Sequence, residues 1–194
     1  MRLKGVKIGF ALTGSYCCLD TVLPHVGRLM DEEAEVFPII SSIVDSADTK
    51  FGTSDKWKNM LFEMTGRKAI TTVIEAEPIG PQKLFDVVVV APCTGNTLAK
   101  LTNGITDTAV LMSVKAQLRN QRPVVLAVST NDGLSMNAKN IGMLLNMRNI
   151  YMVPFGQDNP LAKPNSLMAK WDLITDTILE ALKGRQYQPV LIMR

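Results

Sequence analysis

The chain has 194 residues, of which 46% are hydrophobic and 20% charged, so it can bury one substantial core and we expect a single domain over residues 1–194. Its longest purely apolar stretches, such as residues 87–91, are far too short to cross a bilayer, and the absence of an amino-terminal signal pattern favours a cytoplasmic protein. The formal charge of +3 comes from basic residues scattered among acidic ones, which argues against nucleic-acid binding.

The amino-terminal half alternates apolar, strand-like segments with helix-like ones. The first strand runs directly into a tight turn that contains Gly14, and a helix follows this turn. The expected elements are, in chain order, a strand at 6–12, a helix at 16–30, a strand at 35–41, a helix at 54–65 capped by Ser54, and a short strand at 71–76.

The carboxyl-terminal half begins with the clearest strand, residues 86–91, because an uninterrupted β-branched run is typical of a strand covered on both faces. A polar turn at 92–97 follows it. The expected elements beyond are helices at 98–102 and 108–119, a strand at 123–128, a polar loop at 129–135, a helix at 137–146, a last core strand at 150–154, and a long amphipathic helix at 166–183 ended by Gly184.

Strands that alternate with helices predict parallel pairing through crossover connections. We therefore expect an α/β fold, a three-layer αβα sandwich with a parallel Rossmann-like (flavodoxin-like) sheet. Ligands bind such sheets outside the carboxyl ends of the strands, where the strand order reverses. The loops of interest are those at 13–18, 41–48, 92–97 and 129–135.

The first of these loops offers a possible anion site. Gly14 and Ser15 stand where the first strand meets the first helix, so free backbone N–H groups and the helix dipole can hold a phosphate, although a glycine needed only for the turn explains the pattern equally well. Ser15 and Tyr16 stand where a Walker loop requires Lys and Ser/Thr. The second strand ends in Ser41 and Ser42 instead of an acidic residue, so a mononucleotide fits better than a dinucleotide.

The segment 91–107 is more specific, because it contains a proline-x-threonine-x-asparagine-threonine-x-alanine-lysine pattern that starts at Pro92. This pattern resembles the FMN-wrapping loop of the flavoprotein family that includes the phosphopantothenoylcysteine and peptidyl-cysteine decarboxylases and the flavin prenyltransferases. The resemblance covers essentially the whole chain. It implies an FMN site formed by Gly14, Ser15, Ser41, Pro92, Thr94, Asn96, Thr97, Ser129 and Thr130.

Within the family, the segments 129–135, 137–140 and 151–158 resemble one component of an oxidoreductase that aromatises a dihydropyridine dicarboxylate during sporulation. The resemblance implies a homo-oligomer in the mother cell, with a dehydrogenase-like partner chain that binds NADP. Hydride would pass from the substrate ring to NADP or to FMN. Lys100, Lys139 and Lys163 are candidate partners for the two substrate carboxylates.

Two other functions stay open. The decarboxylases of the family share a catalytic histidine and a proline-x-methionine-asparagine motif, whereas this chain has one histidine, His25, in the first predicted helix, and residues 129–132 differ from the motif. The chain could still act as an FMN-dependent decarboxylase or prenyltransferase on another substrate, or as a non-catalytic partner of the dehydrogenase chain. Cys17, Cys18 and Cys93 match neither a disulfide framework nor a zinc site, and we expect reduced, mostly buried thiols.

Overall fold

The strands form where apolar, mostly β-branched residues follow one another. The central strand contains the four valines 87–90, none of which is exposed, as expected for a strand covered on both faces. In the computed structural model, which describes residues 1–193, the strands are β1 Lys7–Leu12, β2 Glu35–Ile40, β3 Val87–Cys93, β4 Val124–Thr130, β5 Ile150–Met152, β6 Phe155–Gly156 and β7 Leu167–Ala169.

The strand order creates one reversal next to the first strand. β2 and β3 pair in parallel on opposite sides of β1, and β4 and β5 extend the sheet beyond β3. The five parallel strands therefore have the order β2-β1-β3-β4-β5, which is the flavodoxin-like arrangement that we predicted. The chain changes direction across the sheet between β1 and β3, so a ligand site is expected at their carboxyl ends.

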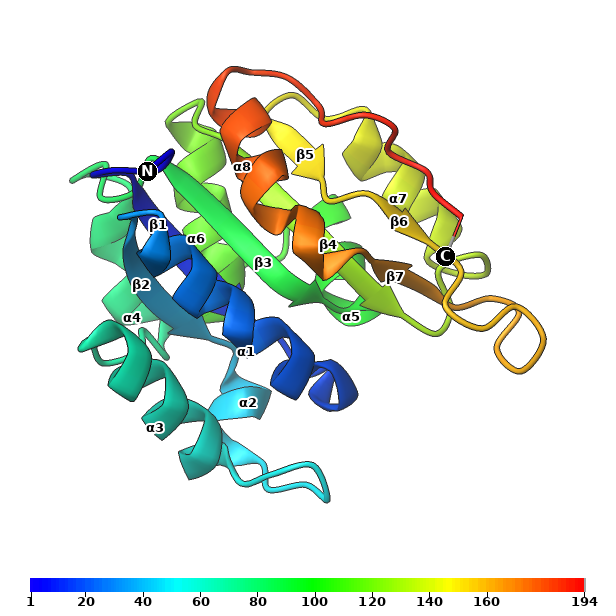
Figure 1. Cartoon of the computed structure of the whole chain (residues 1–194), viewed down its shortest axis with the longest axis horizontal. Coiled ribbons are helices and arrows are strands. Elements are labelled where there is room, and N and C mark those ends of the chain that lie inside the picture. Colours follow the sequence, from blue (N-terminus) through cyan, green and yellow to red (C-terminus); the bar gives the residue numbers. More distant parts are fainter. Residues whose placement is uncertain (194) are drawn as a thin grey trace.

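Helices cover both faces of this sheet, which confirms the three-layer sandwich. In Figure 1, α1 and α8 lie in front of the sheet and α6 lies behind it. Among residues 1–193, no helix combines the length and apolarity needed to span a membrane. The helices are α1 Tyr16–Asp31, α2 Ser42–Ser46, α3 Ser54–Thr65, α4 Val73–Ala76, η1 Glu77–Ile79, α5 Gly95–Thr102, α6 Ala109–Arg119, α7 Ala138–Leu145, η2 Trp171–Leu173 and α8 Ile174–Leu182.

The strand predicted at 71–76 is wrong, because these residues begin a helix. The Thr72 side chain accepts a hydrogen bond from the backbone N–H of Glu75, and the Glu75 carboxylate accepts one from the backbone N–H of Thr72. This reciprocal capping box starts α4. Only Ile70 reaches the sheet, through an isolated bridge to Ile39.

The long helix predicted at 166–183 is also wrong in its first part. Leu167 and Ala169 are buried while Met168 between them is partly exposed, which is the two-residue period of a strand. This strand, β7, pairs antiparallel with the end of β4 and with β6, so the strand predicted at 150–154 is not the last. The helical period begins only at Ile174.

Three predicted boundaries also shift. The cap of α3 is Thr53, whose hydroxyl accepts the backbone N–H of Lys56, and not Ser54. The polar turn at 92–97 is divided between the end of β3 and the start of α5, and the loop at 41–48 contains the short helix α2. β4 likewise continues to Thr130, into the predicted loop at 129–135.

The capping box of α4 gives a stability prediction. Replacing Thr72 by Ala removes the acceptor for the Glu75 N–H and should lower the free energy of unfolding by about 1 kcal/mol. Thr72→Ser keeps a capping hydroxyl and is the matched control. Urea denaturation of both variants measures the difference, and equal stabilities would show that the cap does not contribute.

Candidate functional site

A small cavity with polar and apolar lining lies at the carboxyl ends of β1, β2 and β3, where the strand order reverses. Its volume is about 100 Å³. Asn96 and Lys100 of α5 also line it, as do apolar side chains that include Ile43 and Leu111. Most of its polar groups are hydroxyls, supplied by Thr13, Ser41, Ser42, Thr94, Thr97 and Thr108.

The Thr13 hydroxyl joins the two main walls of the cavity. Its Oγ1 donates to the carbonyl of Pro92 at 2.7 Å and accepts the backbone N–H of Thr94 at 3.1 Å. Thr13 is buried, so this hydroxyl satisfies its hydrogen-bonding capacity within the protein. The loop after β1 and the loop after β3 are therefore fixed relative to each other.

Ser41, by contrast, has a hydroxyl whose hydrogen-bonding capacity is unused. The residue is 7% exposed and lines the cavity, and no residue within 1–193 provides a hydrogen-bond partner for its Oγ. Its backbone N–H is satisfied by the carbonyl of Leu12 at 3.0 Å, which fixes the residue beside β1. Leaving a buried hydroxyl unpaired costs about 1–3 kcal/mol, so this group indicates a place for a polar ligand atom.

The start of α5 supplies the third wall. The Thr94 hydroxyl caps this helix by accepting the backbone N–H of Thr97 at 3.3 Å, and the two hydroxyls lie 3.0 Å apart. Asn96 follows in the first turn. One turn later, the Lys100 ammonium donates to the Asp107 carboxylate at 2.6 Å, so the cation that lines the cavity already has an anionic partner.

The turn after β1 leaves the start of α1 open to an anion. Ser15 precedes this helix without a side-chain capping bond, and no acidic residue stands in the first turn. Instead, the Ser15 hydroxyl lies 2.9 Å from that of Ser129 and near the Cys18 thiol. Gly14 lines the cavity, whereas Ser15 and Ser129, whose hydroxyls contact each other, are not part of the lining.

A second polar group forms where β4 leads into α7. Asp132 accepts hydrogen bonds from the Thr130 hydroxyl and from the amide of Asn137, whose nitrogen is 2.9 Å from each carboxylate oxygen. A Cβ on Gly95 would lie 2.5–2.8 Å from atoms of these three side chains, so α5 packs directly against them. Thr130 thus stands apart from the cavity lining. Sequence reasoning missed Asp132 and Asn137, for which the polar loop itself was the only signal.

The remaining lysines suggested by the sequence lie elsewhere. Lys139 is exposed on α7, and Lys163 is exposed in a loop where its ammonium is 3.9 Å from the Asp158 carboxylate. Neither lines the cavity, where Lys100 is the one titratable side chain among residues 1–193. Pro92, whose carbonyl holds Thr13, supports the cavity wall through its backbone.

His25 and the thiols do not line the cavity either. His25 is buried in the middle of α1, where an Arg28 nitrogen is 3.5 Å from Nδ1. Burial, reinforced by the Arg28 charge, lowers the pKa of His25 below its ordinary value. Cys17 is exposed, while Cys18 and Cys93 are buried free thiols whose pKa values burial raises.

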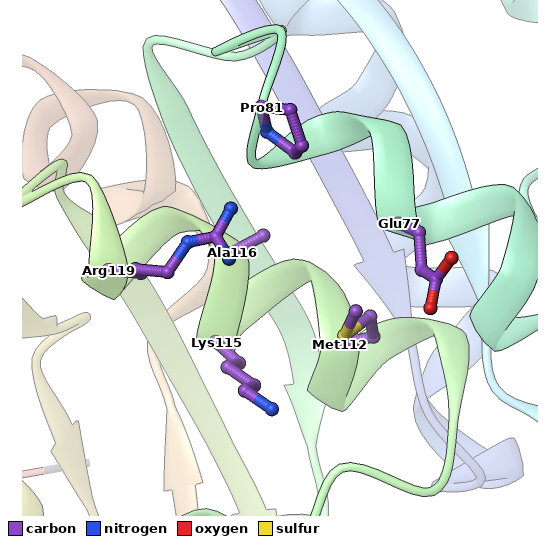
Figure 2. A pocket seen from close by; sticks show the side chains of 6 residues that line it. All are labelled: Glu77, Pro81, Met112, Lys115, Ala116 and Arg119. Carbon is purple, nitrogen blue, oxygen red and sulfur yellow. The ribbon is translucent and has the colours of Figure 1, made fainter.

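A larger hollow of about 220 Å³ lies between η1 and α6 (Figure 2). Met112, Lys115 and Arg119 of α6 line it, as does Glu77 of η1. It shares no residue with the cavity at the strand ends, and none of its lining residues belongs to a loop at the carboxyl end of a strand. We therefore take the smaller cavity at the topological reversal as the candidate site, because the fold places ligands there.

Comparison with known proteins identifies similar sequences over nearly the whole chain. The sequence model of the Flavoprotein family matches residues 1–183. The chain is 47% identical over 190 residues to the B subunit of dipicolinate synthase of Bacillus subtilis (strain 168), covering 98% of this chain and 95% of that protein.

Solved structures also resemble the chain over nearly its full length. The crystal structure of the dipicolinate synthase B subunit from Bacillus halodurans C matches with a TM-score of 0.92 and 47% identity over 100% of both chains. The FMN-binding protein AtHal3 matches with a TM-score of 0.68 and 20% identity, over 95% of this chain and 100% of that one, which shows the shared fold.

Gly95 provides a test of the packing beside the cavity. Gly95→Ala should destabilise the protein by about 1–3 kcal/mol, because the added methyl group overlaps polar atoms that cannot easily move. Gly142→Ala on α7 is the matched control, since a methyl group added there would have no atom within 4 Å. Thermal and urea unfolding of both variants measure the difference, and a neutral Gly95→Ala would contradict the packing.

His25 gives a prediction about pH. Its lowered pKa means that the unfolded chain binds a proton more readily than the folded one, so the stability contributed by neutral His25 is present above pH 6.5 and is lost as the pH falls through the folded pKa. His25→Gln should flatten the dependence of the unfolding free energy between about pH 7.5 and pH 5.5. Urea unfolding across this window tests it, and an unchanged slope would refute the assignment.

Proposed function

This chain belongs to the flavoprotein family, and we propose that it binds FMN and acts as the B subunit of a dipicolinate synthase, the enzyme that oxidises dihydrodipicolinate to dipicolinate in sporulating cells. The similarity to the B subunits of two Bacillus enzymes over nearly the full length supports the activity. The observation that supports the cofactor is the unpaired Ser41 hydroxyl in a cavity lined by hydroxyls.

The residues of the cavity fit the polar part of FMN. Hydroxyl side chains such as Ser41 and Thr94 can both donate to and accept from the ribityl hydroxyls, and the uncapped start of α1 next to Gly14 suits the phosphate. The cavity is smaller than the roughly 300 Å³ of a pocket that encloses a whole drug-sized ligand. A cavity of this size would hold the ribityl phosphate part of FMN.

The chemistry of the proposed reaction needs little from the side chains of this protein. Oxidation would transfer a hydride from the dihydropyridine ring to the acceptor and release a proton to solvent, and the gain of aromaticity favours the step. Bound FMN supplies a hydride acceptor. The protein's part is to fix the cavity walls through Thr13 and to offer Lys100 to one substrate carboxylate, in exchange for Asp107.

A second chain is part of the proposal. The similar proteins are named as the B subunit of their enzyme, which implies a partner. We propose that this partner is the dehydrogenase-like A subunit of dipicolinate synthase, with NADP as its cofactor. Among residues 1–193, Lys100 is the only lysine of the cavity, so the second carboxylate of the substrate would need a cation from outside it.

A non-catalytic role is the competing proposal, and one observation favours it. Within residues 1–193, the cavity lining contains no acid or base except Lys100, which is already bonded to Asp107. Such a lining could belong to a chain that only stabilises the dehydrogenase partner. A decarboxylase is less well supported, because the single histidine lies in α1 beside Arg28 and away from the cavity.

Ser41→Ala separates binding from folding. The variant should bind FMN about tenfold more weakly, because it loses a hydrogen bond to the ligand, while the ligand-free protein becomes slightly more stable as the unpaired buried hydroxyl disappears. Ser46→Ala, which removes an exposed hydroxyl from α2, is the control. FMN titration followed by visible absorption and thermal unfolding gives both quantities.

Reconstitution with the dehydrogenase-like partner then tests the activity. Full turnover of dihydrodipicolinate by that partner on its own would favour the non-catalytic role, whereas turnover that requires this chain and falls with Asn96→Ala would support the proposed one. Absence of FMN binding to the wild-type chain would overturn the cofactor assignment.

A further inference from the structure

The carboxylate of Asp132 is the centre of a hydrogen-bonded network outside the cavity. It belongs to the loop between β4 and α7 and accepts bonds from the Thr130 hydroxyl and the Asn137 amide. Asn137 is 6% exposed and makes no capping bond to α7, so its side chain is committed to this network. Charge-assisted bonds of this kind are about twice as strong as neutral ones and fix side-chain orientation.

The network contacts α5 at both ends of that helix. At the start, Gly95 allows the backbone to approach so closely that a Cβ would lie 2.8 Å from an Asp132 oxygen and 2.5 Å from the Asn137 amide nitrogen. At the other end, the Asn137 oxygen accepts from the Asn140 amide at 2.8 Å, and the Asn140 oxygen accepts from the Thr102 hydroxyl at 3.0 Å. We call these four side chains, Asp132, Asn137, Asn140 and Thr102, the α5 clamp.

The same helix presents Asn96, Thr97 and Lys100 to the cavity. We propose that Asp132 is a positioning residue for the cofactor site, because the α5 clamp fixes the helix that carries three cavity residues without contributing any atom to the lining. The inference rests on the proposed function, in which the cavity binds FMN.

The charge of Asp132 also makes the electrostatic environment at the start of α5 different from that at the start of α1, at the same edge of the sheet. α5 already has a carboxylate beside its first residue, which stabilises the positive end of its dipole. The first turn of α1 has no acidic residue. The start of α1 is therefore the more favourable of the two for an anion.

The test exchanges the two partners of the central hydrogen bonds. Asp132→Asn replaces one carboxylate oxygen by an NH2 group, so one of the two bonds from the Asn137 amide becomes a donor–donor contact and the charge is lost, and FMN affinity should fall about tenfold. The double variant Asp132→Asn with Asn137→Asp restores donor to acceptor in the reverse sense and keeps an oxygen for Asn140. Ser135→Ala, an exposed change in the same loop, is the control.

The readouts are the FMN dissociation constant, the shape and position of the visible band of bound flavin, and the thermal midpoint. We expect Asp132→Asn to weaken FMN binding and alter the band, the double variant to restore both, and Ser135→Ala to match the wild type. If Asp132→Asn lowers only the thermal midpoint, or if the wild type binds FMN and Asp132→Asn binds it equally well, the positioning role is wrong. Failure of the wild type to bind FMN would instead overturn the proposed function.

Discussion

The buried hydroxyl of Thr13 connects two walls of the candidate site by hydrogen bonds. Thr13 donates to the carbonyl of Pro92 in β3 and accepts from the backbone N–H of Thr94, so two hydrogen bonds connect the loops that follow β1 and β3. These two strands are neighbours in the sheet but are separated in the sequence by β2 and its helices. Parallel pairing brings their carboxyl ends to one edge of the sheet. The hydrogen bonds of the Thr13 hydroxyl then link the two loops that form walls of the cavity.

The polar groups at this edge fall into two sets with different tasks. Those that face the cavity are neutral hydroxyls together with the Lys100–Asp107 pair, and Ser41 among them still lacks a partner within residues 1–193. Those of the α5 clamp bond to one another and are not part of the cavity lining. A ligand could therefore bind without breaking many hydrogen bonds within the protein, and it would gain bonds to the cavity groups that still lack a partner. This is expected of a preorganised site.

The fold could be predicted from the sequence where one signal dominated. The valine run at 87–90 specified a covered strand, and the strand-turn-helix around Gly14 predicted one of the loops that line the cavity. The Pro92–Lys100 pattern pointed to the cavity because α5 alone supplies Asn96, Thr97 and Lys100. Local patterns failed where tertiary pairing decided the outcome. Residues 167–169 are too short for their two-residue period to be distinguished from the helix after them, and they become a strand only by pairing with β4 and β6.

Individual side chains were harder to predict than elements. Ser15 and Ser129 follow different strands, and only the structure shows that their hydroxyls bond to each other and not to the cavity. Lys139 and Lys163 carry the right charge, but the sequence does not specify the direction of an exposed side chain. Asp132 stayed unnoticed because its role depends on the absence of a side chain at Gly95, which is distant in the sequence.

The most direct test of the central claim is a crystal structure of the chain with FMN. We predict the phosphate at the start of α1 beside Gly14 and a ligand oxygen within hydrogen-bond distance of the Ser41 Oγ. A flavin bound elsewhere, such as the hollow between η1 and α6, with the Ser41 hydroxyl still unpaired, would contradict that prediction.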